Sequence, residues 1–223
     1  MLMDQNINTV ANWFSKDRSL TEMKEGTFNK LKIWEKEVAS SYFPQSAKIL
    51  DVGCGMGREA FNLYDMGYIL TGVDISENAI KSAQQFASES NRNISFLLTN
   101  GTKLPFEDNT FDVIIIWSQT MGIIYDENHQ LAFLEECNRV LKKKGIVSFS
   151  GHDREYLELN YQQYLKGKRF FPFADTDIYW EMFTVDEMKE LAQKAGFNIL
   201  ECQKGKIYCE EDGTILHCEC EKS

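Results

Sequence analysis

Two short segments of this chain combine glycines and carboxylates in an order that could hold a nucleoside. The first is the loop Asp51-Val52-Gly53-Cys54-Gly55-Met56-Gly57, and the second is a segment that ends in Asp74. Glycine lets the backbone approach a ligand closely because no Cβ intervenes, and a helix that begins after the loop offers unpaired N–H groups. A carboxylate at the end of a second strand can accept hydrogen bonds from ribose hydroxyls. These features predict a nucleoside site at the carboxyl edge of an α/β sheet.

The spacing of the glycines separates two classes of ligand. Dinucleotide-binding loops follow the pattern G-x-G-x-x-G, whereas the glycines here are Gly53, Gly55 and Gly57, and position 58 is arginine. Asp51 places a negative charge directly before the turn, which suits a ligand with an ammonium group better than a pyrophosphate. The spacing therefore disfavours NAD-dependent oxidoreduction.

The elements that must position these residues alternate between strands and helices. Apolar segments typical of strands occur at 48–52, 68–74, 94–98, 111–117, 145–150 and 197–202. Amphipathic segments typical of helices occur at 58–66, 77–90, 128–142 and 184–194. This alternation favours right-handed βαβ units, and a turn at 211–213 predicts a final hairpin. We expect an α/β fold: a doubly wound, mostly parallel seven-stranded sheet with an antiparallel C-terminal hairpin, N-terminal helices and a small insert after strand five.

Three segments resemble motifs of class I S-adenosylmethionine-dependent methyltransferases. Residues 49–57 look like the first motif of the family, residues 72–76 like the second and residues 100–112 like the third. The small-molecule branch of the family, of the kind found in quinone biosynthesis, is the most similar. The resemblance implies S-adenosylmethionine as cofactor and S-adenosylhomocysteine as product. It also implies two parts of the chain, a helical segment at 1–45 and a methyltransferase domain at 46–223, with a cap insert at about 153–183.

The resemblance further implies a set of cofactor-binding residues. They are Asp51, Gly53, Cys54, Gly55, Asp74, Ile75, Asn100, Gly101, Thr102, Trp117, Ser118 and Trp13. Asp51 would sit near the amino group of the cofactor, Asp74 would hold the ribose hydroxyls and Ile75 would pack on the adenine. Asn100 departs from the pattern, because the family usually has an acidic residue there. Trp13 is the expected lid residue, since Phe14 fits the apolar face of the first helix better.

Catalysis has one candidate residue in the sequence. His152 directly follows the fifth predicted strand, so it should face the cleft, where an imidazole could remove a proton from a methyl acceptor. A hydrogen-bonded loop residue is the alternative interpretation. The aromatic insert could roof an apolar acceptor pocket or form the small core of a cap. Nothing in the pattern requires a metal.

The most consistent function is methyl transfer to a small-molecule acceptor, with the methylated atom left open. Two alternatives remain: a methyltransferase of a macromolecule (RNA or protein), and a cofactor-binding protein that has lost catalysis. The formal net charge of −10 makes a nucleic-acid partner less favourable, since phosphate binding needs a basic face. The chain has no apolar stretch that could span a bilayer and no signal peptide, so we expect a cytoplasmic monomer or homodimer without a membrane partner.

Overall fold

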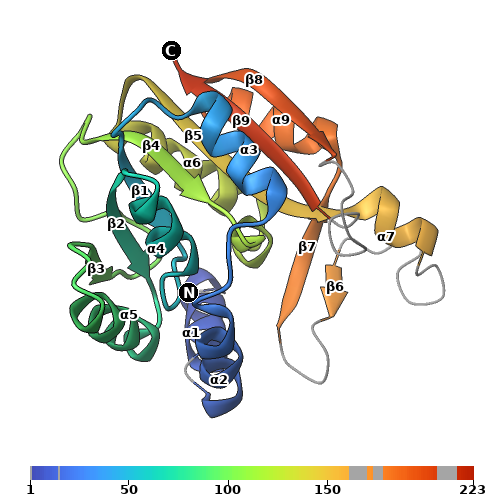
Figure 1. The fold of residues 1–223 in the computed structure, drawn as a ribbon. Coiled ribbons are helices and arrows are strands. Elements are labelled where there is room, and N and C mark those ends of the chain that lie inside the picture. The colour runs from blue at the N-terminus through green and yellow to red at the C-terminus, as the bar shows by residue number, and fades with distance from the viewer. Residues whose placement is uncertain (1, 15, 161–169, 173–177, 205–214) are drawn as a thin grey trace.

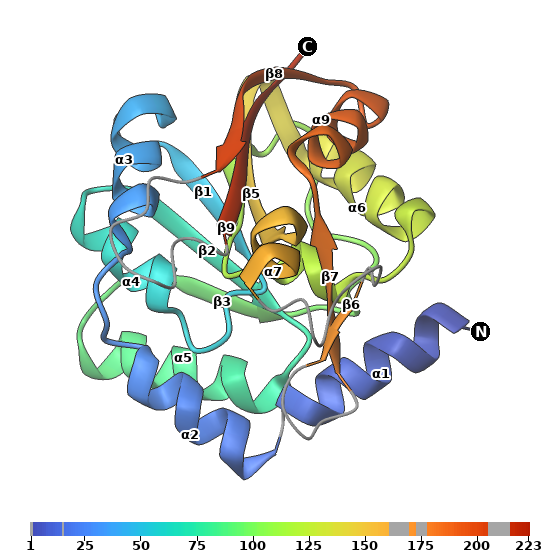
Figure 2. The same cartoon turned by 90° about the vertical axis from the view of Figure 1, so that its right-hand side faces the viewer.

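Parallel strands form the centre of the molecule, and helices cover both faces of the sheet (Figures 1 and 2). The computed structural model describes residues 2–14, 16–160, 170–172, 178–204 and 215–223. The five central strands are β1 (Lys48–Val52), β2 (Ile69–Asp74), β3 (Ser95–Leu98), β4 (Phe111–Ile116) and β5 (Leu141–Asp153). They lie in the order β3-β2-β1-β4-β5 and are all parallel, which confirms the doubly wound α/β fold.

The side chains of β4 show how the sheet divides two hydrophobic cores. Val113 and Ile115 belong to one core, whereas Ile114 and Ile116 belong to the other, as the two-residue period of a strand requires. The first core is covered by α3 (Ile33–Tyr42), α4 (Arg58–Asp65) and α5 (Glu77–Glu89). The second is covered by α6 (Glu127–Val140) and α9 (Val185–Lys194). Burial on both faces explains why this strand is apolar throughout.

Ser76 and Thr184 cap the first turns of α5 and α9. The Ser76 hydroxyl accepts a hydrogen bond from the N–H of Ala79, 3.3 Å away, at the start of α5. Thr184 accepts from the N–H of Glu187, and the Glu187 side chain accepts from the N–H of Thr184, which is a complete capping box.

The far edge of the sheet is antiparallel, as predicted from the final hairpin. The strands β8 (Phe197–Lys204) and β9 (Ile215–Lys222) pair with each other, and β9 also pairs antiparallel with β5. The turn predicted at 211–213 lies outside the described residues.

The predicted number of seven strands is wrong, because the described part of the insert adds an eighth strand to this sheet. The strand β7 (Tyr179–Phe183) runs parallel to the end of β5, where His152 faces Met182 and Asp153 faces Phe183. The short strand β6 (Phe170–Pro172) pairs with β7. A parallel pairing of only two residues leaves no local pattern in the sequence, so β7 was not predictable from it.

Two helices from the start of the chain lie beside the carboxyl ends of the central strands (Figure 1). They are α1 (Leu2–Phe14) and α2 (Asp17–Gly26). The insert after β5 contains another short helix, α7 (Arg154–Asn160). The hydroxyl of Ser76 donates to the carbonyl oxygen of Phe14 at 3.3 Å, which joins the end of α1 to the turn after β2. None of the described helices combines the length and the apolar character that crossing a membrane would require.

Candidate functional site

A cavity of about 320 Å³ opens at the carboxyl ends of β1, β2 and β4. It lies where the strand order reverses between β1 and β4, the position at which open α/β sheets bind ligands. Its walls come from the loop after β1, the turns after β2, β3 and β4, the start of α6, the helices α1 and α2, and β7. The sheet thus brings together segments from most of the chain.

The glycine loop forms one wall of this cavity with a backbone that other residues rarely adopt. Gly53 and Gly55 have φ angles of 73° and 52°, in the left-handed region that favours glycine. A Cβ atom on Gly53 would lie 2.6 Å from Cγ2 of Thr120, and one on Gly55 would lie 3.2 Å from Sδ of Met23. The two glycines therefore keep the loop close to the cavity without filling it. Cys54 also lines the cavity, and burial raises the pKa of its thiol.

Asp74 lines the cavity at the end of β2 and holds the glycine loop in place. Its Oδ2 accepts from the N–H of Gly55 and its Oδ1 accepts from the N–H of Ser76, both at 2.8 Å. Burial raises the pKa of Asp74, while these two N–H groups act in the opposite direction. Each carboxylate oxygen can accept a second hydrogen bond. The residue can therefore bind neighbouring hydroxyls on a ligand while it holds the loop.

Asp51 carries a buried oxygen that needs a partner. The residue is 2% exposed, directly before the glycine loop, and its Oδ2 has no hydrogen-bond partner among the described residues. Burial raises the pKa of Asp51 well above its ordinary value, and the negative charge of Glu59 raises it further. Asp51 is not among the described residues that line the cavity, although Val52 and Gly53, which follow it in the chain, do line it. Because an unpaired buried carboxylate is costly, a cationic group of a ligand bound against the glycine loop would be favoured at this position.

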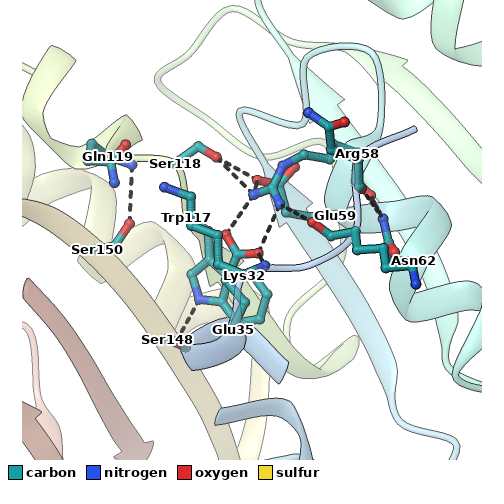
Figure 3. A network of polar contacts seen from close by, with 12 residues as sticks. Lys32, Glu35, Arg58, Glu59, Asn62, Trp117, Ser118, Gln119, Ser148 and Ser150 are labelled. Carbon is teal, nitrogen blue, oxygen red and sulfur yellow. Dashed lines mark hydrogen bonds and ion pairs between the residues drawn. The ribbon is translucent and has the colours of Figure 1, made fainter. Parts of the chain in front are cut away.

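Arg58 links two buried carboxylates beside the cavity (Figure 3). Its guanidinium donates to Glu35 through both terminal nitrogens, at 2.9 and 2.6 Å, and to Glu59 at 2.6 Å. The hydroxyl of Ser118 donates to the same oxygen of Glu59 at 2.6 Å. Burial raises the pKa of Glu35. Burial alone would also raise that of Glu59, but the charge of Arg58 and the Ser118 hydrogen bond hold it below its ordinary value.

Ser118 and Trp117, which were both predicted to bind the cofactor, point in different directions at the end of β4. Ser118 lines the cavity, with a left-handed φ of 50°, and Gln119 continues the turn at 59°. Strained backbone of this kind is concentrated at functional sites. Trp117 points into the core instead, where its Nε1 donates to the Ser148 hydroxyl at 2.7 Å and its ring stacks on Phe43. Trp117 is therefore not among the described residues that line the cavity.

The third motif contributes backbone rather than the side chain of Asn100. Oδ1 of Asn100 accepts from the N–H groups of Thr102 and Lys103, at 3.1 and 3.2 Å, and Asn100 is exposed. Asn100 and Thr102 are absent from the described lining of the cavity. Gly101 does line it, with a φ of 74°, and a Cβ there would lie 3.1 Å from Cγ2 of Ile75, another lining residue.

The first helix presents Phe14 to the cavity, not Trp13. Ile7, Val10 and Phe14 line the cavity from one face of α1, at the spacing expected for neighbouring turns. Trp13 is 6% exposed, lies outside this lining set and packs with its ring perpendicular to that of Phe14, with centroids 4.8 Å apart. The apolar stripe that suggested core packing for Phe14 is thus the face that covers the cavity.

His152 and His129 differ in their position relative to the cavity. His152 is not among the described lining residues, and its ring packs perpendicular to that of Trp180, which does line the cavity. His129 lines the cavity from the first turn of α6, beside Tyr125 and Phe133. The four-residue spacing between His129 and Phe133 was the available signal that both share one helix face.

Comparisons with known proteins agree with this architecture. Residues 49–145 match a protein-family model described as "Methyltransferase domain". Demethylmenaquinone methyltransferase from Staphylococcus aureus (strain JH9) is 30% identical over 195 residues, which are 85% of this chain and 77% of that protein. YqeM from Bacillus subtilis, whose name also describes a methyltransferase, is 32% identical over 119 residues. That match covers 53% of this chain and 47% of YqeM, so the chain matches about half of the length of this relative.

A solved structure shows the same fold. The crystal structure of a SAM-dependent methyltransferase from Methanosarcina mazei superposes with a TM-score of 0.73 and is 24% identical. The superposition covers 87% of this chain and 99% of that one. The two chains therefore share the same overall fold.

Proposed function

We propose that this chain, which belongs to the class I S-adenosylmethionine-dependent methyltransferases, methylates a small apolar or aromatic molecule. One observation carries the proposal: the cavity extends from the glycine loop to a wall of Ile124, Tyr125, Phe133 and Trp180. A volume of about 320 Å³ suits small molecules. The name of the Staphylococcus aureus relative, a demethylmenaquinone methyltransferase, supports an acceptor of this class.

The residues around the glycine loop fit S-adenosylmethionine. Asp51, with its unpartnered buried oxygen, would bind the ammonium group of the cofactor. Gly53 and Gly55 would admit its methionine portion, and Asp74 would accept hydrogen bonds from the ribose hydroxyls. Ile75 would pack against the adenine. When bound, the cofactor supplies a methyl group activated by a positively charged sulfur.

The chain itself must align the acceptor and keep water away from it. Phe14 and Val10 of α1 cover one side of the cavity, and Trp180 of β7 covers another. Alignment of two bound reactants can supply much of the rate enhancement of a transfer reaction. These covering residues come from the two segments outside the central β/α repeats, so the acceptor specificity of this chain would reside mainly there.

A screen for S-adenosylhomocysteine release tests the proposal. The purified chain would be supplied with S-adenosylmethionine and with three acceptor sets: small phenols, quinols and amines; total RNA; and denatured proteins. The proposal expects turnover with the small-molecule set. Turnover with RNA or protein alone would contradict it, and binding of the cofactor without turnover by any set would favour a protein that has lost catalysis.

Replacing Asp74 by alanine should weaken S-adenosylhomocysteine binding by about 1.5–3 kcal/mol, the value of hydrogen bonds to a charged group. The variant loses the acceptor for ligand hydroxyls and also leaves the N–H groups of Gly55 and Ser76 without their partner. Titration calorimetry measures the change. Asp112→Ala, at the start of β4 and the opposite edge of the sheet, is the control and should bind normally. Unchanged affinity in the Asp74 variant would remove this residue from the site.

A further inference from the structure

His129 occupies the wall of the cavity that faces the proposed acceptor. It lies in the first turn of α6, is half-buried and lines the cavity together with Tyr125, Phe133 and Trp180. The residue therefore borders the cavity in a wall that also contains aromatic side chains. Nothing in the binding of the cofactor, as proposed above, uses this residue.

One contact determines which nitrogen of His129 carries the proton. Nδ1 lies 3.0 Å from the carbonyl oxygen of Tyr125. A carbonyl oxygen can only accept, so Nδ1 must be the donor, and in the neutral ring Nε2 is then left with the lone pair. The same contact fixes the orientation of the ring, as a base in an active site requires.

The other ionisable side chains of the described lining are not suited to accept a proton from a methyl acceptor. Each is engaged by another group or carries a proton. They are Cys54, Arg58, Glu59, Asp74, Lys103 and Tyr125. Arg58 and Glu59 pair with each other. Asp74 accepts two backbone N–H groups, and the proposed function assigns its remaining acceptor positions to the ribose hydroxyls of the cofactor. Burial raises the pKa of the Cys54 thiol and of the Tyr125 hydroxyl, so both keep their protons. Lysine carries an ammonium group, which is a donor without an acceptor.

We infer that His129 is the catalytic base of this protein and that its acceptor carries a nucleophile with a removable proton, such as a hydroxyl. Nε2 takes this proton, and the electron pair left on the nucleophile forms the bond to the transferred methyl carbon. The carbon–sulfur bond of S-adenosylmethionine breaks with its electrons on sulfur, and the proton then passes from His129 to water. This inference rests on the proposed function, because it requires a small acceptor in the cavity.

The protonation of the ring can be measured without knowledge of the acceptor. The chain has three histidines, so a sample labelled with ¹⁵N-histidine gives few signals, and single His→Asn variants assign them. At pH 8.5 we expect His129 to show a protonated Nδ1 and an unprotonated Nε2. A ring with the proton on Nε2 would overturn the inference.

Kinetics with the acceptor found in the release screen provide the second test. In His129→Asn, the side-chain amide can still donate to the carbonyl of Tyr125 but has no basic nitrogen. We expect the single-turnover rate to fall about 100-fold, at the lower end of the range for acid–base catalysis, while S-adenosylhomocysteine affinity is unchanged. Added imidazole should restore part of the rate in His129→Ala. A purely structural role for His129 would instead leave the asparagine variant active.

Two further outcomes separate this inference from the proposed function. A rate loss in His152→Asn that is absent from His129→Asn would assign the base to His152 and overturn the inference. A small acceptor without a removable proton would also overturn it, yet would leave the proposed function intact. Methylation of RNA or protein alone would overturn both.

Discussion

Replacing Arg58 by methionine should lower the free energy of unfolding by about 3–5 kcal/mol, the cost of breaking a buried ion pair. The guanidinium contacts Glu35 and Glu59, whose side chains are 1% and 7% exposed. Methionine preserves the apolar stem of the side chain but leaves both carboxylates buried without a counter-charge. Glu35 belongs to α3 and Ser118 to the turn after β4. Loss of the Arg58 ion pairs should therefore also weaken the contacts between these elements beside the cavity.

Urea unfolding followed by tryptophan fluorescence measures this effect. The matched control is Arg92→Met, because Arg92 pairs with Asp65 at the surface, where the pair is worth about 0–1 kcal/mol. Glu35→Gln should recover part of the loss when added to Arg58→Met, since it removes one of the buried charges. The interpretation would be wrong if Arg58→Met destabilised the protein no more than Arg92→Met.

The pH dependence of this variant follows from the direction of the Glu59 shift. In the wild type the pKa of Glu59 is lowered, so its stabilising contribution is present above the ordinary value of 4.5 and is lost as the pH falls below it. Without Arg58 this contribution disappears and burial raises the pKa of both carboxylates. The difference in stability between variant and wild type should therefore shrink as the pH is lowered from 7 to 5.

Replacing Asp51 by asparagine should weaken S-adenosylhomocysteine binding roughly 100-fold or more, as expected when a buried charge pair loses one partner. The stability of the ligand-free protein should not fall. The pKa of Asp51 is raised, so ionisation of Asp51 destabilises the folded protein as the pH rises above the ordinary value of 3.8. Asparagine cannot ionise and avoids this cost. Weaker binding without a loss of stability would distinguish a ligand-binding role from a structural one.

Proton release provides a second readout of the Asp51 site. In the free protein Asp51 holds its proton to a higher pH than usual, and a bound ammonium group should favour its ionisation. Affinity should therefore increase with pH until the raised pKa is passed, with release of up to one proton. Calorimetry at pH 6.5 in buffers of different ionisation enthalpy measures this number. Equal proton release by wild type and Asp51→Asn would contradict the account, and Asp112→Asn should behave as wild type.

The central part of the site could be predicted because it is local in sequence. Asp51, Gly53 and Asp74 lie on one β-α-β unit, in which the order of strand, turn and helix fixes where each residue points. The same reasoning applies to the final hairpin, whose strands show their own alternation. These features depend on neighbours in the chain, so a pattern of residue types is sufficient to identify them.

Trp117 and Asn100 are two of the predicted cofactor-binding residues that do not line the cavity, and the sequence contains a reason for each. Trp117 follows Val113 and Ile115 at a spacing of two, and all three belong to the same hydrophobic core. Asn100 precedes a glycine, and its side chain folds back on the backbone of its own turn, as asparagine commonly does. In both cases a local structural preference accounts for the side chain that the family resemblance had assigned to the cofactor.

The remaining residues of the site meet only through the tertiary fold. Glu35 contacts Arg58 across 23 positions of the chain, and Trp180 reaches the cavity because β7 adds to the end of β5. His129 is placed by the way α6 follows the turn after β4. No local pattern marks such residues. The part of the cavity proposed to hold the acceptor was therefore less predictable than the part around the glycine loop.

Calorimetric titration of the wild-type chain with S-adenosylmethionine and with S-adenosylhomocysteine tests the central claim most directly. The account predicts that each ligand binds at one site per chain, that Asp51→Asn greatly weakens both, and that NADH gives no heat. The absence of heat with both sulfur ligands, or equal binding by wild type and Asp51→Asn, would contradict it.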